Sequence, residues 1–310
     1  MAERIDVYEV GPRDGLQNET AVLATDQKLA LIARLVGAGL RRMEATSFVS
    51  PKAMPQMADA AEVTRGAALA WPDGRFSALV LSELGYDRAI AAGCRSVAVV
   101  VIASESLSRR NSRIGVEGGL GVGRRLLERA RRDGVRTRAY LSAAWACPYE
   151  GPVPAGRATA LAERIWEAGP DELAIADSVG HAEPLEVGRL LEDLGRRLGM
   201  DRLAVHLHDT QALGLANAAA AIAAGVRTVD ASIGGLGGCP FAAGAAGNLA
   251  TEDLVFLAHK MGFETGVDLG RLWEAVAWLD DVVGRRVGGR TRVWWENRGR
   301  FGEPCGARCR

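Results

Sequence analysis

The sequence predicts an α/β fold, a single (β/α)8 barrel with a C-terminal helical extension and a basic tail. Eight short apolar runs alternate with amphipathic helical stretches, and they begin about every 32 residues, the length of one strand and its crossover helix. A doubly wound open sheet uses the same local units and is the alternative. Polar residues at the carboxyl ends of the runs favour the barrel, which gathers its chemistry at that end.

The predicted strands cover residues 5–10, 41–46, 76–81, 96–103, 136–143, 172–178, 203–209 and 228–234. The polar residues at or just beyond their carboxyl ends are Arg13, Asp14, Glu44, Ser82, Glu83, Ser104, Glu105, Tyr140, Ser142, Asp177, Ser178, His206, His208 and Asp209. A glycine-rich loop follows the last run. A ring of polar groups in these places is difficult to explain as a core.

Seven helical stretches fit between the strands, at 29–39, 86–93, 122–134, 156–169, 185–199, 215–225 and 251–262. Their apolar residues recur at i, i+3 and i+4, which is typical of helices that cover a sheet. Thr25 or Asp26 is expected to cap the first helix and Gly37 to end it. A further helix at 267–283 leads out of the barrel. The domains are therefore a catalytic barrel over 1–285 and a basic tail over 286–310.

The composition of the chain excludes several classes of protein. The 310 residues include 38 basic and 38 acidic side chains, and 48% are hydrophobic, which excludes a disordered chain. Zero net charge argues against a nucleic-acid partner. No apolar stretch approaches the ~20 residues that span a membrane, and the N-terminus lacks a secretion signal. We expect a cytoplasmic protein whose five cysteines are reduced.

The tail is strongly basic. Eight arginines and two glutamates between Arg285 and Arg310 leave a net charge of +6. The simplest interpretation is a solvated, partly disordered tail. The alternative is a patch that binds a phosphorylated ligand, or a partner subunit through Trp294 and Trp295. Cys305 and Cys309 lie close enough to the end of the chain to oxidise between chains.

The pair His206 and His208 is the strongest chemical feature. Residues i and i+2 of a strand point to the same face, so both imidazoles are expected to enter the barrel together. A single histidine there is more often a core residue, but two at this spacing predict a metal site. Asp209 either joins them or caps the helix that follows.

Two more residues can complete the metal site. Asp14 follows the first strand, which in a closed barrel neighbours the eighth, and Asn248 follows the glycine-rich loop. Two imidazoles, a carboxylate and an amide oxygen suit Mg²⁺, Mn²⁺ or a similar ion with open positions better than a closed zinc site. Arg13 is a fixed positive charge that can stabilise an enolate or oxyanion, or a structural partner of Glu44.

The loop over residues 234–247 contains six glycines in 14 residues and fits neither a dinucleotide-binding motif nor a P-loop. We expect a mobile loop over the barrel mouth. Cys239 at its centre is either an acid or base carried in by loop closure, or a neutral small residue.

Several motifs together resemble the 3-hydroxy-3-methylglutaryl-CoA lyase family, within a wider superfamily of metal-dependent lyases and Claisen enzymes. They are Val-Gly-Pro-Arg-Asp-Gly-Leu-Gln-Asn-Glu (10–19), Glu-Ala-Thr-Ser-Phe-Val-Ser-Pro-Lys (44–52), Cys-Pro-Tyr-Glu-Gly (147–151), Gly-Leu-Gly-Gly-Cys-Pro (235–240) and Gly-Asn-Leu-Ala-Thr-Glu-Asp (247–253). The likeness extends over about residues 5 to 285.

The resemblance implies a role for each matching residue. Asp14, His206, His208 and Asn248 match the metal ligands, Arg13 the catalytic arginine, Cys239 the loop cysteine, and Glu44 and Asp177 the catalytic acids. From the ring of polar groups we assign substrate binding to Arg13, Tyr140, Ser142, Ser178 and Glu83. Glu83 puts a carboxylate where the family usually has a neutral amide, which is expected to alter acyl-group selection.

The resemblance also implies the reaction, cleavage of 3-hydroxy-3-methylglutaryl-CoA to acetyl-CoA and acetoacetate with Mg²⁺ or Mn²⁺, as in leucine degradation. The partners implied are an acyl-CoA substrate and a second copy of the chain, without nucleic acid or membrane. The alternatives are a lyase for a related 3-hydroxyacyl-CoA, an acyl-CoA Claisen synthase on the same scaffold, and a non-enzymatic scaffold that binds through the tail.

Overall fold

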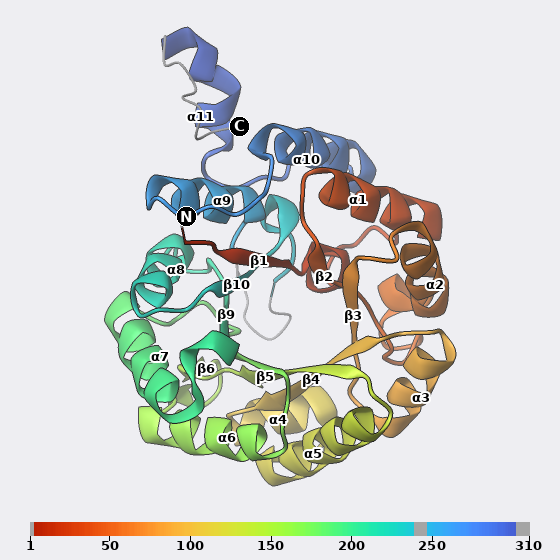
Figure 1. Ribbon diagram of the computed structural model, residues 1–310, viewed down its shortest axis with the longest axis vertical. Helices are drawn as coiled ribbons and strands as arrows, with labels where there is room; N and C mark the ends of the chain where they lie inside the picture. The colour runs from red at the N-terminus through yellow and green to blue at the C-terminus, as the bar shows by residue number, and fades with distance from the viewer. Residues whose placement is uncertain (1–2, 239–246, 302–310) are drawn as a thin grey trace.

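A closed ring of eight parallel strands forms the centre of the molecule, and helices surround it (Figure 1). The computed structural model describes residues 3–238 and 247–301. The barrel strands are β1 (Asp6–Glu9), β2 (Arg42–Ser47), β3 (Arg75–Leu79), β4 (Ser96–Ile102), β5 (Arg136–Ser142), β8 (Glu172–Asp177), β9 (Leu203–Leu207) and β10 (Thr228–Ala231). Each predicted strand is present, and the barrel is confirmed over the open sheet.

The barrel closes between its first and last strands. β1 pairs with β10 from Asp6↔Thr228 to Glu9↔Ala231, and with β2 on its other side. An open doubly wound sheet would leave two edge strands instead. Residues that follow β1 therefore lie beside residues that follow β10 and β9, which is the neighbourhood the predicted metal site requires.

The helices are α1 (Thr25–Gly37), α2 (Ala60–Ala70), α3 (Glu83–Ala91), α4 (Glu105–Ser112), α5 (Val116–Arg132), α6 (Ala155–Glu167), α7 (Pro184–Leu198), α8 (Gly214–Ala223), α9 (Thr251–Lys260), α10 (Leu269–Val283) and α11 (Arg292–Asn297). A hairpin of β6 (Ala146–Cys147) and β7 (Gly151–Pro152) follows β5. The helices α2, α4 and α11 and this hairpin were not predicted from the sequence. α2 is rich in alanine and has only Val63 as a large apolar residue on its buried face, so its periodicity is weak.

The first helix begins differently from the expectation. Its N-cap residue is Ala24 rather than Thr25 or Asp26. The side chain of Gln27 reaches back and accepts a hydrogen bond from the Ala24 amide at 2.9 Å. A glutamine three residues into the helix thus satisfies an end amide that the usual cap side chain would leave unpaired.

Two apolar layers hold the barrel. The large layer lies between strands and helices, while a small inner cluster fills the barrel with Leu79, Ala98, Tyr140, Ala174, Ala176 and Ala204. The alanines leave interior space, and buried polar side chains from β5, β9 and β10 occupy it. None of the described helices is long and apolar enough to cross a membrane.

The C-terminal extension packs on the barrel as far as it is described. Trp295 is buried and stacks on Trp273 of α10, and Trp294 packs at 5.0 Å from Phe256 of α9. Among the described basic residues of the extension, four pair with carboxylates: Arg285 with Glu19, Arg286 with Glu296, Arg290 with Asp209, and Arg292 with Asp280. These ion pairs neutralise much of the positive charge for which a phosphate-binding patch was considered. Cys305 and Cys309 lie outside the described residues.

Candidate metal centre at the barrel mouth

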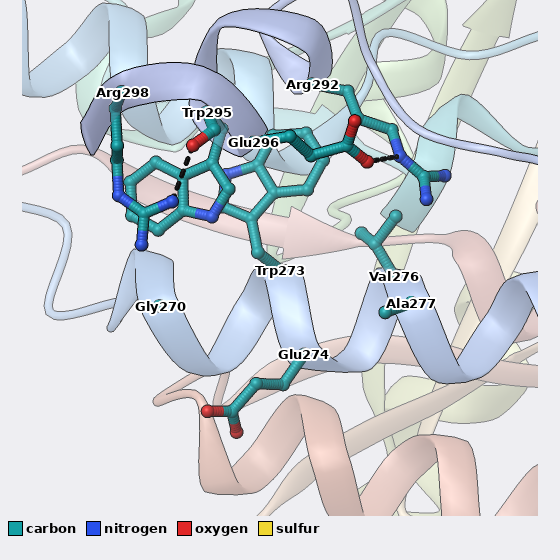
Figure 2. A pocket seen from close by; sticks show the side chains of 9 residues that line it. All are labelled: Gly270, Trp273, Glu274, Val276, Ala277, Arg292, Trp295, Glu296 and Arg298. Atoms are coloured by element: carbon teal, nitrogen blue, oxygen red, sulfur yellow. Dashed lines mark hydrogen bonds and ion pairs between the residues drawn. The ribbon is translucent and has the colours of Figure 1, made fainter. Parts of the chain in front are cut away.

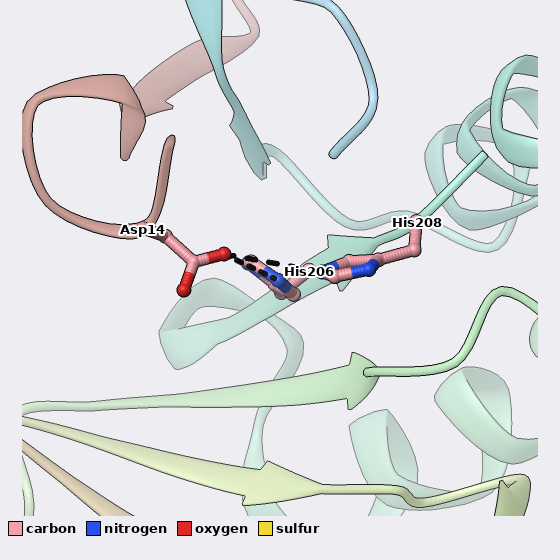
Figure 3. A group of neighbouring side chains, drawn as sticks. All are labelled: Asp14, His206 and His208. Atoms are coloured by element: carbon pink, nitrogen blue, oxygen red, sulfur yellow. Dashed lines mark ion pairs between the residues drawn. The ribbon is translucent and has the colours of Figure 1, made fainter. Parts of the chain in front are cut away.

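Asp14, His206 and His208 converge at the carboxyl end of the barrel (Figure 3). One possible ligand atom from each lies within 4.8 Å of the others, and all three residues are buried. Asp14 Oδ2 is 4.0 Å from His206 Nε2 and 3.9 Å from His208 Nε2. The predicted i, i+2 arrangement of the two imidazoles is therefore present at one site.

A single π-helical turn positions Asp14. Residues Gly11–Gly15 form this turn, and the amides of Arg13, Asp14 and Gly15 all point to the Val10 carbonyl. Such turns are common at functional sites. Gly11 is needed there because a Cβ on it would lie 2.6 Å from Glu9 Oε1 and 2.8 Å from Ile233 Cγ2.

Asn248 reaches the same site from the far side of the glycine-rich loop. Residues His208 and Asn248 form an antiparallel bridge, and the Asn248 Nδ2 donates to Asp14 Oδ2 at 2.9 Å and to the Leu236 carbonyl at 3.0 Å. Rotation of its amide would turn Oδ1 toward Asp14 and the imidazoles. All four predicted ligands are thus brought together.

The protonation states of these groups suit a divalent cation. Burial opposes the charge on Asp14, but Arg13 and the two imidazoles outweigh it and lower the pKa of Asp14 to about 2. Burial and the neighbouring His206 lower the pKa of His208 to about 4. The site at neutral pH therefore offers an ionised carboxylate and a neutral imidazole, which are the forms that bind metal. His208 Nδ1 is also buried without a hydrogen-bond partner in the described structure.

Arg13 lies between the metal ligand and the second strand. Its Nη1 pairs with Asp14 Oδ1, and its Nε donates to Glu44 Oε2 at 2.5 Å. Burial disfavours its charge, but Asp14 and Glu44 outweigh burial and raise the pKa of Arg13. Burial raises the pKa of Glu44 despite its contact with Arg13. Both interpretations of Arg13 from the sequence remain compatible, since a residue that pairs with Glu44 also faces the pocket.

A pocket of about 360 Å³ opens beside these residues. Its polar lining residues include Arg13, Asp14, Tyr140, Ser142, Ser178, His206 and His208, and its apolar lining residues include Val49, Met54, Leu79, Leu81, Val100, Ile102 and Leu107. Ser142 and Ser178 share a hydrogen bond of 2.7 Å between their hydroxyls. This mixture of a few convergent polar groups with an apolar wall is typical of small-ligand sites.

A second pocket of about 360 Å³ lies outside the barrel, between α10 and α11 (Figure 2). Trp273, Trp295 and Arg298 line one end of it, and the Arg298 guanidinium stacks 3.8 Å above Trp295. Equal size does not distinguish the two pockets. The converging carboxylate and imidazoles occur only at the barrel mouth among the described residues, so we place the chemistry there.

Four of the described site residues do not line the barrel pocket: Glu44 and Asn248, which contact Arg13 and Asp14 from behind, and Asp177 and Glu83. Asp177 is fully buried, and its carboxylate accepts hydrogen bonds from the amides of Gly180, His181 and Ala182 at 2.9 to 3.2 Å. Burial raises its pKa, although these amides oppose the shift. Glu83 occupies the first turn of α3, and its exposed side chain pairs with Arg125 of α5 at 3.1 Å.

Two neighbouring predictions concern the loops. Asp209 is not the N-cap of α8, which is Leu213, but its Oδ1 accepts the amide of the first helical residue, Gly214, at 2.9 Å. Cys239 lies outside the described residues. The residue before it, Gly238, lines the pocket, and its carbonyl accepts a hydrogen bond from Asn18 at 3.0 Å.

Two buried carboxylates that were not predicted from the sequence as functional, Glu9 and Glu252, hold the loop after β10. Glu9 accepts the amides of Gly11 and Ile233, and Glu252 accepts those of Gly234 and Gly289. Burial raises the pKa of each to about 7. Glu9 lies in an apolar strand and Glu252 lies in the first turn of a helix. Nothing in the local sequence pattern distinguishes either residue from an ordinary surface carboxylate.

Glu252 is expected to make the fold less stable as the pH rises. Because its pKa is higher in the folded chain than the ordinary 4.5, its stabilising contribution is complete below pH 4.5 and is lost as the pH rises through about 7. We expect a loss on the order of 3 kcal/mol in the free energy of unfolding. Urea unfolding between pH 5 and 8.5 should show a flatter pH dependence for Glu252→Gln than for the wild type; parallel curves would contradict this assignment.

Comparisons with known proteins agree on one family. A family model described as HMGL-like matches residues 4–278. The hydroxymethylglutaryl-CoA lyase of Pseudomonas mevalonii is 42% identical over 291 residues, 94% of this chain and 95% of that protein. The structure of the HMG-CoA lyase of Bacillus subtilis is similar with a TM-score of 0.91 at 37% identity, covering 95% of this chain and 98% of the other. An HMG-CoA lyase of Acinetobacter baumannii, solved with coenzyme A and 3-methylmalate, has a TM-score of 0.89 at 32% identity and covers 98% and 96%.

Proposed function

The chain belongs to the HMGL-like family, and we propose from this premise that its barrel mouth cleaves 3-hydroxy-3-methylglutaryl-CoA to acetyl-CoA and acetoacetate. The observation that carries the proposal is the convergence of Asp14, His206 and His208 beside Arg13 in one pocket. A carbon–carbon cleavage of this kind needs a group that activates a hydroxyl and a group that stabilises an enolate. The carboxylate and imidazoles would hold a metal that activates the hydroxyl, and Arg13 would stabilise the enolate.

Asp14, His206, His208 and Asn248 would hold a Mg²⁺ or Mn²⁺ ion. When bound, the ion would polarise the 3-hydroxyl oxygen of the substrate and lower the pKa of that hydroxyl. The ionised carboxylate of Asp14 and the neutral imidazole of His208 are suitable ligands for either ion. The chain's own residues supply the remaining steps.

Of the two residues predicted to remove the hydroxyl proton, only His206 lines the pocket and can receive it. Asp177 lies at the carboxyl end of the neighbouring strand β8, but it is fully buried and its carboxylate is held by three backbone amides. As the proton leaves, the C3 oxygen becomes the ketone oxygen of acetoacetate and the C2–C3 bond breaks. The electron pair of that bond passes into the thioester enolate of acetyl-CoA. Arg13 faces the pocket with a fixed positive charge and would stabilise the enolate oxygen.

The other predicted residues support these steps. Glu44 holds Arg13 in place through its carboxylate. Tyr140, Ser142 and Ser178 line the pocket and would orient the acyl group through their hydroxyls. Cys239 would donate its thiol proton to C2 of the enolate, which completes acetyl-CoA.

The thiol of Cys239 is expected to matter for turnover rather than for binding. Cys239→Ser should lower kcat by about 100-fold or more, because the hydroxyl is a far weaker acid, while KM changes little. Steady-state kinetics with 3-hydroxy-3-methylglutaryl-CoA and Mg²⁺ measure both constants. Cys147→Ser is the matched control, since Cys147 is buried beside Ser104. An unchanged kcat for Cys239→Ser would remove the thiol from the mechanism.

Glu83 is expected to have little influence on the substrate. Its exposed pair with Arg125 contributes at most about 1 kcal/mol, and its side chain does not line the pocket. Glu83→Asn should therefore keep kcat/KM within about two-fold of the wild type. An improvement of ten-fold or more would show that the carboxylate reaches the substrate, as the sequence suggested.

The apolar wall of the pocket favours one second candidate, a related 3-hydroxyacyl-CoA with a larger apolar substituent. Val49, Met54, Leu79 and Leu81 line the same pocket as the polar groups. We also propose a homodimer in the cytoplasm with a role in leucine degradation. The buried free thiols of Cys94 and Cys147 suit a reducing compartment. Light scattering of the purified chain would test the dimer.

The function is tested by offering the purified protein 3-hydroxy-3-methylglutaryl-CoA with Mg²⁺ or Mn²⁺, and then with a chelator. Cleavage above about 1 s⁻¹ that stops on chelation and returns with metal would support the proposal. Metal binding without cleavage would direct the search to the related 3-hydroxyacyl-CoA. Cleavage that continues at the same rate after the chelator has removed all metal would contradict the proposed metal role.

A further inference from the structure

The imidazole of His206 has a buried partner behind it, whereas that of His208 does not. His206 Nδ1 lies 3.2 Å from Asp230 Oδ2. In the described structure, His208 Nδ1 has no hydrogen-bond partner. The two imidazoles of one site are therefore held in different ways.

Both oxygens of the Asp230 carboxylate are fixed. Tyr140 donates its hydroxyl to Oδ2 at 3.0 Å, and Arg138 Nη2 donates to Oδ1 at 2.5 Å. Asp230 is 1% exposed, so water does not compete for these contacts. The carboxylate cannot rotate without breaking at least one of them.

Arg138 is in turn held in the barrel interior. Its guanidinium lies 3.7 Å from the centre of the Tyr8 ring and 5.0 Å from that of Tyr140. Its Nε is 3.3 Å from Glu172 Oε2, at the amino end of β8. A continuous line of contacts thus runs through the barrel from Glu172 to His206.

We propose that Asp230 and Arg138 are positioning residues of the metal site. Asp230 accepts the Nδ1 proton of His206, which leaves the Nε2 lone pair directed toward Asp14. Arg138 holds the carboxylate in the orientation that this requires. A carboxylate behind a metal-bound histidine fixes the ring and strengthens it as a ligand. The inference rests on the proposed function, because it takes His206 as a metal ligand.

The tautomer of His206 tests the first half of the inference without any metal. The chain has four histidines, so selective ¹⁵N labelling gives few ring signals, and His206→Gln identifies the one in question. We expect His206 of the wild type to carry its proton on Nδ1. In Asp230→Asn the side-chain amide can donate to Nδ1 instead, so we expect protonation on Nε2 to appear.

Titration with Mn²⁺ tests the second half. Asp230→Asn is expected to weaken Mn²⁺ binding by about 10- to 100-fold, which is typical of the loss of such a partner. Arg138→Lys should weaken it less, since lysine keeps the charge but not the planar fork. Ser77→Ala is the matched control, because it removes the buried 2.5 Å contact with Tyr8 and touches neither Asp230 nor His206.

Each outcome has a distinct meaning. A wild-type His206 tautomer in Asp230→Asn, or Mn²⁺ affinity within two-fold of the wild type, would overturn the inference. So would an equal loss in Ser77→Ala, which would make the effect one of barrel packing. A wild-type chain that does not bind Mn²⁺ would instead refute the proposed metal role. If Asp230→Asn does not fold, the Mn²⁺ titration of Arg138→Lys decides the question, and wild-type affinity there would overturn the inference.

Discussion

Replacement of His208 by alanine is expected to abolish Mn²⁺ binding and to lower kcat by at least about 1,000-fold, with the fold retained. The imidazole is one of the two in the proposed ligand set, and its loss leaves Asp14, His206 and the weakly binding amide of Asn248 to hold the ion. Activation of the substrate hydroxyl by a metal contributes several kcal/mol to the rate, and each 1.36 kcal/mol is a factor of ten. The fold should survive because His208 makes no side-chain hydrogen bond through Nδ1 and stands beyond the end of β9.

The matched control is His259→Ala. His259 lies on α9, where its Nε2 contacts Thr265 at 3.0 Å, and it does not line the barrel pocket. We expect wild-type kcat and Mn²⁺ affinity for this variant. Calorimetric titration, circular dichroism and steady-state kinetics on both variants separate metal loss from unfolding. A folded His208→Ala protein that still binds Mn²⁺ and turns over at near the wild-type rate would contradict the metal assignment.

The barrel could be predicted because its signals are local. A strand of four to seven residues and a helix with a 3.6-residue period are visible in any short window, and the spacing of the runs predicts their number. The metal ligands could be predicted for a related reason. His206 and His208 are two residues apart, and the ends of barrel strands are neighbours whatever the helices contain.

The support behind the ligands could not be predicted in the same way. Asp230 faces His206 because β9 and β10 pair in register at these two residues. Arg138 reaches Asp230 from β5, across the barrel interior. The register of two strands and a contact across the barrel interior both depend on the closed sheet as a whole. Neither can be predicted from a short segment of the sequence. A buried charged residue inside an apolar strand was the one available sign.

Glu83 illustrates the opposite failure. Glu83 follows the carboxyl end of a strand, and the carboxyl ends of the barrel strands surround the pocket. Its side chain was therefore expected to face the pocket. Ser82 instead caps α3 by accepting the Gly85 amide at 3.1 Å, and this turns Glu83 outward toward Arg125. The position along the chain predicted the correct end of the barrel, but the cap decided the direction of the side chain.

Replacement of Arg13 by lysine is expected to lower kcat by about 100- to 1,000-fold while KM stays within a few-fold. The guanidinium contacts Glu44 and Asp14 at the same time and still faces the pocket. A lysine ammonium is a point charge on a flexible stem and cannot keep these contacts and the orientation toward the enolate together. Because the charge remains, the two buried carboxylates keep a cation. Arg13→Ala would lose it, and we expect about 3–5 kcal/mol of destabilisation there.

Arg42→Lys is the control that isolates the effect of position. Arg42 also pairs with two carboxylates, Asp6 and Glu172, but at the amino ends of the strands, opposite the pocket. Arg42→Lys also replaces a planar guanidinium by an ammonium, so its loss of stability should be similar to that of Arg13→Lys. Its kcat should stay close to that of the wild type. Kinetics with 3-hydroxy-3-methylglutaryl-CoA and urea unfolding measured on both variants give the comparison. A raised KM with unchanged kcat in Arg13→Lys would mean that Arg13 binds the substrate equally well before and during the reaction, and the enolate would then need another stabilising group.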